Sequence, residues 1–180
     1  LTSQTGRIRK ITADGAVSTI ASQTRGRSPL LATDSAGTLY AADAGLILKY
    51  AASGQATAVS GTEGQLGNTI VAITFDSADR LFVLDKEVIV EPMFGYPSVR
   101  YVRLGIRHVG RDGRATTLVS APSDCHNYGG RGNDDLCQAI TMVAKADGQF
   151  LVAEGIYDGN SPYQYVQLRN YTQQGTYTVV

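Results

Sequence analysis

The sequence lacks an excess of charge of either sign and has no long hydrophobic run. Sixteen Lys and Arg residues balance sixteen Asp and Glu residues among 180 residues. This balance gives no global positive field for neutralising phosphates, which disfavours nucleic-acid binding. No run of about 18 apolar residues occurs, so we expect no membrane span, and no export-signal segment is recognisable. The chain begins at Leu1 rather than Met, and we expect that something upstream was removed or is missing.

Catalytic signatures are also missing. The sequence contains no Gly-x-Ser-x-Gly elbow, no phosphate-binding glycine loop and no His-Glu-x-x-His pair. No window keeps the 3.6-residue period of an amphipathic helix, whereas Ser, Thr, Gly and β-branched residues are abundant. With 43% hydrophobic residues the chain can still bury a core, so we expect one all-β domain over residues 1–180.

Only two cysteines occur, and both lie in the segment SDCHNYGGRGNDDLC. A close pair that flanks a polar, glycine-rich loop predicts a disulfide between Cys125 and Cys137, and hence an oxidising compartment. A metal site of Cys125, His126 and Cys137 is the weaker alternative, because it lacks a fourth ligand and a Cys-x-x-Cys spacing.

A phrase built around a glycine recurs four times. Apolar residues stand seven and four positions before this glycine and five positions after it, which is typical of a β-hairpin with a tight turn. The four copies are RIRKITADGAVSTI, LILKYAASGQATAV, GIRHVGRDGRATTL and QLRNYTQQGTYTVV, with their glycines at Gly15, Gly54, Gly113 and Gly175.

A second kind of hairpin alternates with the first. In DSAGTLYAAD, DSADRLFVLD and KADGQFLVAE a turn is followed by an apolar pair and a carboxylate, at Asp43, Asp85 and Glu154. Each full repeat therefore holds four short antiparallel strands in roughly 40 residues, which is the sequence pattern of a β-propeller blade. We expect a half blade at 6–22 and blades at 29–60, 69–120 and 138–180, about three and a half blades in all.

These residues suggest a family. The segments SPLLATDSAGTLYAADAGLILKY and GRIRKITADGAVSTIAS resemble the NHL-type repeat of six-bladed β-propellers of the TolB-like and NHL superfamily. The resemblance implies a propeller fold, here a partial one, and it specifies function far less than fold. The strands missing from the first hairpin are expected from the remainder of a longer chain or from a second chain, because a closed ring leaves no unpaired sheet edge.

Strand direction assigns the insertions to one face of such a propeller. The short turns fall on one face, and the segments 86–102, 120–137 and 155–165 fall on the other. Long loops on a rigid scaffold often bind partners, and tyrosine is common at recognition surfaces. Packing of the loops on one another is an equally open interpretation. The candidate contact residues are Tyr96, Tyr101, His126, Tyr128, Tyr157, Tyr163 and Tyr165.

The remaining titratable residues favour structural roles. His108 stands where the other repeats have Lys or Asn, on an ordinary polar position of the third strand. The carboxylates Asp43, Asp85 and Glu154 close the second strand of each blade, and we expect them to bond turn amides or an Arg or Lys of the third strand. His126 has Asp residues nearby in the sequence, but such a loop is more often a solvated turn.

The sequence therefore predicts an extracellular or periplasmic propeller module that binds a protein or glycan partner and requires no cofactor or metal. One alternative is a metal-dependent enzyme similar to the six-bladed lactonases or lyases, although the channel-lining strands offer only Asp34, Asp76 and Lys145. Another is a structural module of a surface or filament assembly, joined to another copy by strand addition.

Overall fold

The protein is all-β, as the sequence predicts. A computed structural model describes residues 6–24, 29–43, 46–59, 66–67, 69–93, 96–120, 125–126, 139–156 and 165–180, with side chains placed except at 23, 43, 88–93, 96–104, 125–126, 156 and 165. These residues hold fifteen strands and no helix, and thus no helix long and apolar enough to cross a membrane.

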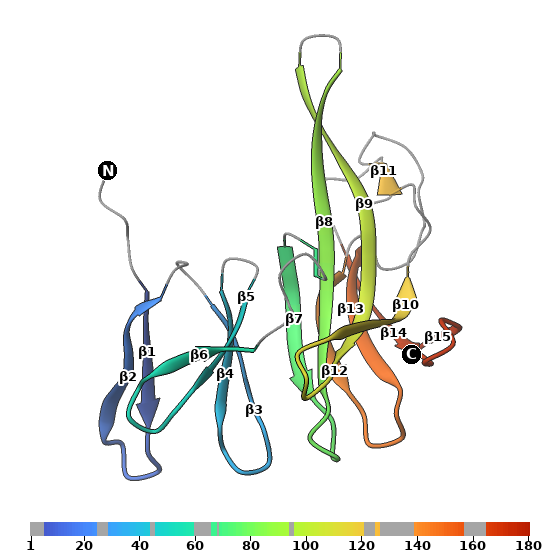
Figure 1. Ribbon diagram of the computed structural model, residues 1–180. Helices are drawn as coiled ribbons and strands as arrows, with labels where there is room; N and C mark the ends of the chain where they lie inside the picture. Colours follow the sequence, from blue (N-terminus) through green and yellow to red (C-terminus); the bar gives the residue numbers. More distant parts are fainter. Residues whose placement is uncertain are drawn as a thin grey trace.

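The strands form four antiparallel sheets, arranged like blades beside one another (Figure 1). Sheet 1 pairs β1 (Gly6–Ile11) with β2 (Val17–Thr24). Sheet 2 has the order β3 (Leu30–Thr33), β4 (Leu39–Asp43), β5 (Leu46–Tyr50) and β6 (Ala56–Ala58).

Sheets 3 and 4 repeat the same order. Sheet 3 runs β7 (Thr69–Phe75), β8 (Leu81–Met93), β9 (Tyr96–Val109) and β10 (Ala115–Ser120), and the short β11 (Cys125–His126) also pairs with β9. Sheet 4 runs β12 (Ala139–Ala144), β13 (Phe150–Ile156), β14 (Tyr165–Tyr171) and β15 (Tyr177–Val179). The first strands lie together, because β7 contacts both β3 and β12.

One turn design recurs between paired strands, and several of its copies lie at the lower edge of Figure 1. In each case the amide of the fourth turn residue donates to the carbonyl of the first, and the amide of the first donates to the carbonyl of the fifth. In the first turn, the Gly15 amide donates to the Thr12 carbonyl at 2.9 Å, and the Thr12 amide donates to the Ala16 carbonyl at 3.0 Å. This is a type I turn closed by a left-handed residue, a common three-residue hairpin loop. The left-handed residues of the described turns are Gly15, Gly37, Gly54, Asp79, Gly113, Gly148 and Gly175.

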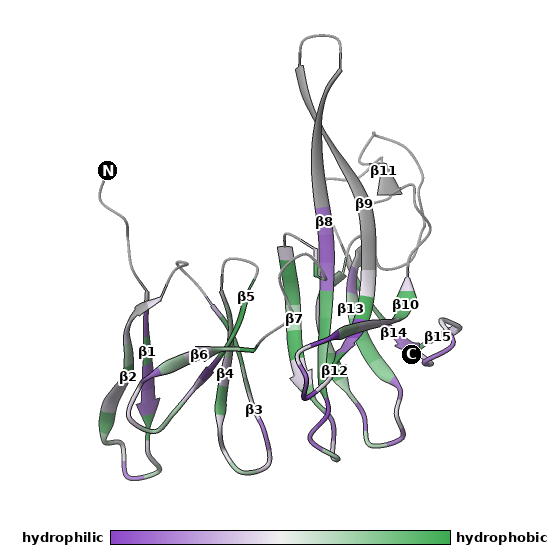
Figure 2. Cartoon of the chain, in the orientation of Figure 1, coloured by the Kyte–Doolittle hydropathy of each residue, from purple (hydrophilic) through white to green (hydrophobic). Residues whose placement is uncertain are grey.

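Strand β8 explains how the sheets stack. Its side chains alternate in direction, so Leu81 and Val83 pack toward sheet 2, whereas Phe82 and Leu84 pack toward sheet 4. All four are buried, and burying each such side chain stabilises the fold by about 1.5–3 kcal/mol. Figure 2 shows the resulting pattern, with hydrophobic residues in the strands and hydrophilic residues at the turns.

Three separate clusters of buried side chains lie between the four sheets in the part of the chain that the structure describes. The cluster between sheets 1 and 2 contains Ile8, Ala21, Ala41 and Tyr50. The next contains Ala42, Ile47, Ile73, Leu81, Val83 and Val109. The last contains Ala72, Phe82, Leu84, Ile106, Val119, Met142, Phe150, Val152 and Tyr171. The core is therefore a row of inter-sheet contacts rather than one central mass.

Candidate functional site

The described part of the insertions, the extension of β8 and β9 with β11 beside it, lies on the side of sheet 3 opposite the short turns (Figure 1). Segment 86–102 is not the loop that the sequence analysis expected. It extends the hairpin of β8 and β9, which stay paired from Leu81 opposite Val109 to Met93 opposite Tyr96 (Figure 1). Neither β7 nor β10 accompanies this extension, since they pair with β8 and β9 only near the base of the hairpin.

A second insertion returns to this hairpin. The short strand β11 pairs antiparallel with β9, so Cys125 lies opposite Tyr101 and His126 lies opposite Arg100. The structure thus brings together three of the predicted contact or disulfide positions, Tyr101, Cys125 and His126, on neighbouring strands. Tyr96 lies farther along β9 near the hairpin tip, and Tyr165 begins β14 in sheet 4.

The other predicted residues on this face lie outside the described residues. These are Tyr128, Tyr157, Tyr163 and Cys137. The proposed pairing of Cys125 with Cys137 therefore stays a prediction, as do the partner contacts of the tyrosines.

Two of the carboxylates that close the second strand, Asp85 and Glu154, have the structural role predicted for them, whereas the side chain of Asp43 lies outside the described ones. Asp85 is fully buried, and both of its oxygens accept from Nε of Arg107 on β9 at 2.8 Å, while the Gly67 amide also donates to it. Glu154 pairs with Arg169 of β14 at 3.2 Å and accepts a 2.7 Å hydrogen bond from the Tyr171 hydroxyl. Burial and this bond to Glu154 raise the pKa of Tyr171 well above its ordinary value.

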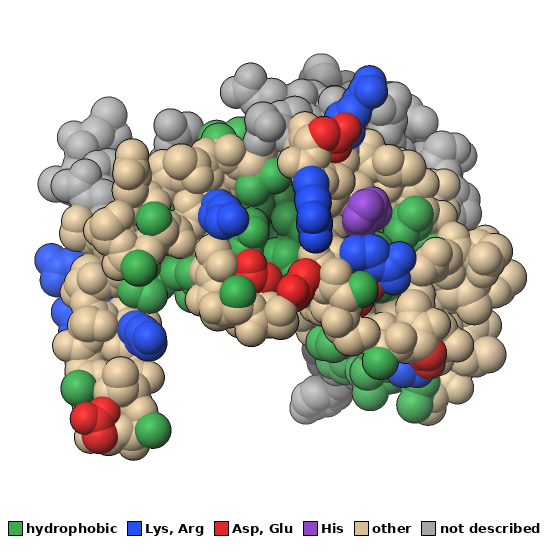
Figure 3. All heavy atoms as spheres, turned by 60° about the horizontal axis from the view of Figure 1, so that its bottom comes forward, with side chains coloured by type: hydrophobic (Ala, Val, Ile, Leu, Met, Phe, Trp, Pro, Cys, Tyr) green, Lys and Arg blue, Asp and Glu red, His purple; other side chains and the backbone are tan. Residues whose placement is uncertain are grey.

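A groove between sheets 2 and 3 was not anticipated. It encloses about 680 Å³ and opens among the short turns, on the side away from the insertions. Figure 3 shows this face hollowed between the sheets, with hydrophobic side chains inside and charged side chains around them. Its floor is the Tyr40–Phe75 ring pair, with centroids 4.8 Å apart.

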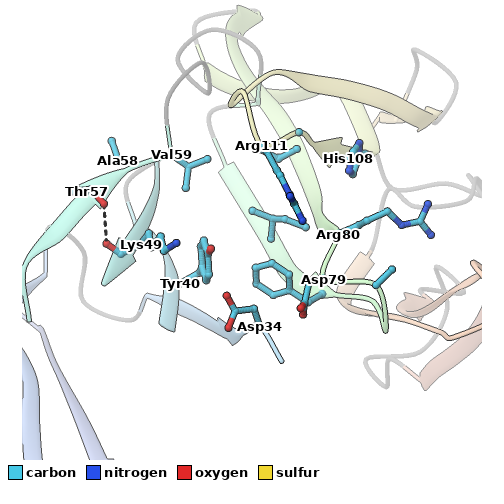
Figure 4. Close-up of a pocket in the computed structure, with 15 residues that line it drawn as sticks. Asp34, Tyr40, Lys49, Thr57, Ala58, Val59, Asp79, Arg80, His108 and Arg111 are labelled. Atoms are coloured by element: carbon cyan, nitrogen blue, oxygen red, sulfur yellow. Dashed lines mark hydrogen bonds between the residues drawn. The ribbon is translucent and has the colours of Figure 1, made fainter. Parts of the chain in front are cut away.

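The groove lining carries charges of both signs, at Asp34, Lys49, Asp79, Arg80 and Arg111. The Lys49 ammonium lies 5.7 Å from the centre of the Tyr40 ring. Arg80 pairs with Asp76 at 2.6 Å. Arg111 extends into the space between the two sheets, whereas Arg80 and His108 point away from it (Figure 4).

Asp79 links the two sheets beneath this groove. Its carboxylate accepts from the Ser35 amide at 2.7 Å and from the Ser35 hydroxyl at 2.5 Å. These two bonds hold the pKa of Asp79 below its ordinary value. The groove therefore combines an aromatic floor with charged residues of both signs, groups that can contact a small polar or aromatic ligand.

No single repeat could have predicted the groove, because residues from two sheets form it. The available signal is the turn DSADR, where Asp replaces the glycine of the other turns. Among the residues that the structure describes, no three His, Cys, Asp or Glu side chains gather as a metal site would require.

No family model matches the sequence, and no curated protein matches it either. The likeness to NHL repeats therefore rests on the residues quoted above and on the blade-like sheets.

Proposed function

We propose that the chain is an NHL-like β-propeller module, secreted or periplasmic, that binds a protein or glycan partner through its inserted face. The observation that carries this proposal is the long β8–β9 hairpin with β11 beside it, which rises from tightly packed sheets. Binding elements gain precision when a rigid scaffold holds them. Six of the ten tyrosines belong to the insertions on this face, at positions 96, 101, 128, 157, 163 and 165.

A shortened hairpin provides the direct test. Glu87 lies opposite Arg103, so residues 88–102 are replaced by Asn-Gly, which forms a two-residue hairpin turn. The wild-type chain and this variant are then compared for binding to a glycan panel and for cross-linking to proteins of the extracellular or periplasmic fluid. We expect the variant to lose the bound partner while its thermal unfolding changes by only a few degrees, because the clustered residues Leu84 and Ile106 are retained.

Point variants separate the tyrosines from the hairpin backbone. Combined Tyr157→Ala and Tyr163→Ala should weaken binding at least about tenfold, since hot-spot aromatic residues commonly contribute about 2 kcal/mol or more. The matched control is Tyr177→Ala, in β15 and outside the insertions. Unchanged binding by both the shortened variant and the double variant would show that the partner does not bind through the inserted face.

The oxidising compartment has its own test. If Cys125 and Cys137 are paired, neither thiol of the unfolded but unreduced chain will react with an alkylating reagent, and both will react after reduction. Mass determination of the alkylated chain measures this. Labelling of both thiols in material isolated without reductant would contradict the predicted disulfide and the location inferred from it.

A further inference from the structure

Strand β1 has an open edge where its equivalents have a partner. Ile8 of β1 occupies the same repeat position as Ile47 of β5, Ile106 of β9 and Leu168 of β14. Each of those three strands is hydrogen-bonded to a strand on both sides, whereas β1 pairs only with β2 among the described residues. The open edge of β1 thus corresponds to the side where β4, β8 and β13 lie in the other sheets.

Arg9 on this strand is equivalent to two arginines that form ion pairs with a carboxylate of the neighbouring strand. It stands six residues before its turn glycine, as Arg107 and Arg169 do, and those two residues pair with Asp85 and Glu154. Arg9 itself is exposed, and no acidic side chain of the described residues pairs with it. The arginine at this repeat position forms an ion pair in sheets 3 and 4, whereas in sheet 1 it forms none with the described residues.

The strand also exposes an apolar residue that its equivalents bury. Ile11 is 71% exposed, whereas Tyr50, Val109 and Tyr171 at the same repeat position are at most 5% exposed. Those residues lie opposite an apolar residue at the start of the neighbouring strand, namely Leu39, Leu81 and Phe150. Tyr50, Val109 and Tyr171 are buried because they also face the preceding sheet. A matching strand beside β1 would therefore place an apolar residue opposite Ile11 and cover only part of it.

The register of the other sheets specifies what such a strand must carry. Val83 lies opposite Arg107 and Val152 opposite Arg169, and in both cases the carboxylate comes two residues later. The required pattern is therefore apolar, any residue, apolar, any residue, acid. The chain itself contains it as Leu39 to Asp43, Leu81 to Asp85 and Phe150 to Glu154.

We propose that the open edge of β1 binds an antiparallel β-hairpin whose outer strand carries this pattern, with its carboxylate on Arg9 and its first apolar residue over Ile11. This goes beyond the proposed partner binding and does not depend on it. A second copy pairing β1 with β1 fits less well, because GRIRKI would oppose its own Arg and Lys residues, and like charges across strands are destabilising.

A fusion tests the proposal within one chain. A copy of residues 139–154, which form β12 and most of β13, is placed ahead of Leu1, so that residues 1–5 connect it to β1. Tethering makes the pairing intramolecular and raises its effective concentration. We expect hydrogen exchange of the β1 amides to slow at least about tenfold, while exchange in β8 and β13 stays as in the parent chain and reports that the fold is intact.

Matched variants identify the contacts. Arg9→Gln in the chain, or Glu154→Gln in the fused copy, should each reverse several-fold of this protection, and the two changes together should reverse no more than either alone. Lys10→Gln removes a charge from the neighbouring position on the opposite side of β1 and should leave the protection unchanged. A fused copy with Val152→Pro lacks the amide needed for pairing and controls for tethering alone.

Two outcomes would overturn the proposal. One is unchanged exchange of the β1 amides on fusion, or equal protection by the fused copies with and without Glu154→Gln. The other is a dimer of the unfused chain, seen by native mass measurement, in which the β1 amides are already protected, because this would assign the edge to a second copy.

Discussion

Asp79 is the only residue other than glycine that adopts the left-handed conformation in the described turns, with φ of 56°. A side chain at positive φ is strained, although Asp tolerates it better than most residues. Its carboxylate bonds to Ser35 of the neighbouring sheet explain why Asp stands where the other turns have Gly. The backbone strain at Asp79 is therefore offset by its hydrogen bonds to the neighbouring sheet.

Two substitutions separate the conformational cost from the contact. Asp79→Ala keeps a side chain at positive φ and loses the Ser35 bonds, whereas Asp79→Gly loses the bonds but removes the strain. The urea midpoints should therefore fall in the order wild type, Asp79→Gly, Asp79→Ala. In the Ser35→Ala background much of the difference between wild type and Asp79→Gly should disappear. An Ala variant at least as stable as the Gly variant would contradict the backbone argument.

Asp76 makes stability depend on acidity. Burial alone would raise the pKa of its carboxyl, but hydrogen bonds from the Arg80 amide and side chain and from the Ala78 amide outweigh burial and lower the pKa. A carboxyl whose pKa is lowered in the folded state stabilises the fold above its unfolded pKa of about 4 and loses this contribution as the pH falls.

The free energy of unfolding should therefore decrease as the pH falls below about 4, and Asp76→Asn should reduce that decrease. Urea unfolding at several pH values measures both slopes. Ser77→Ala, in the same turn, should keep the wild-type slope. Identical acid slopes for wild type and Asp76→Asn would show that this carboxyl does not contribute.

At the scale of the element, the repeated hairpins were predictable and the extended one was not. The turn glycines and the alternating apolar residues indicated the strands correctly because each hairpin contains its own signal. Segment 86–102 contains Pro92 and Pro97, which argue against a strand. The structure accommodates them opposite each other near the tip, where no other strand of the described residues pairs with β8 or β9 and requires their amides.

The Arg–carboxylate pairs show what one strand contributes to its sheet. Arg107→Met would leave Asp85 charged and fully buried without its cation, and breaking such a pair costs about 3–5 kcal/mol. Arg9→Met, at the same repeat position in sheet 1, should change stability by less than about 0.5 kcal/mol. Chemical denaturation compares the two directly. A cost below about 1 kcal/mol for Arg107→Met would show that water or another group replaces the arginine.

At the scale of the whole molecule, the end sheets differ from the middle ones. Ile106 is fully buried between sheets 3 and 4, whereas Leu168, at the same repeat position on the outer side of sheet 4, is 40% exposed. Val180 is 77% exposed, although Val59 and Leu118, its equivalents, pack against buried clusters. The outer surface of sheet 4 thus has the composition of an inter-sheet contact.

Alanine substitution tests whether this surface is covered in solution. Ile106→Ala should cost about 2–5 kcal/mol, the range for large-to-small changes in a packed core. Leu168→Ala should cost less than about 1 kcal/mol if the outer surface of sheet 4 faces water. Urea denaturation at two protein concentrations measures these costs. A large, concentration-dependent cost for Leu168→Ala would show that a second molecule covers sheet 4.

The arrangement of the sheets also explains which features escaped prediction. Hairpins follow from residues close in the sequence, so the pattern was enough to predict them. The groove is different, because Tyr40 and Phe75 belong to separate sheets and meet only once the sheets stack. The same holds for the bond between Asp79 and Ser35 and for the pairing of β11 with β9.

The central claim is that the sheets stack in sequence order, each touching only its neighbours through alternate residues. Nuclear Overhauser contacts between assigned side chains in solution test it most directly. We predict cross-peaks between the rings of Phe82 and Phe150, whose centroids lie 5.0 Å apart, and between those of Tyr40 and Phe75, at 4.8 Å. No cross-peak should join Ile47 to Phe150, which belong to different clusters. A cross-peak between Ile47 and Phe150, with the two ring contacts missing, would contradict the account, because it would place sheets 2 and 4 face to face.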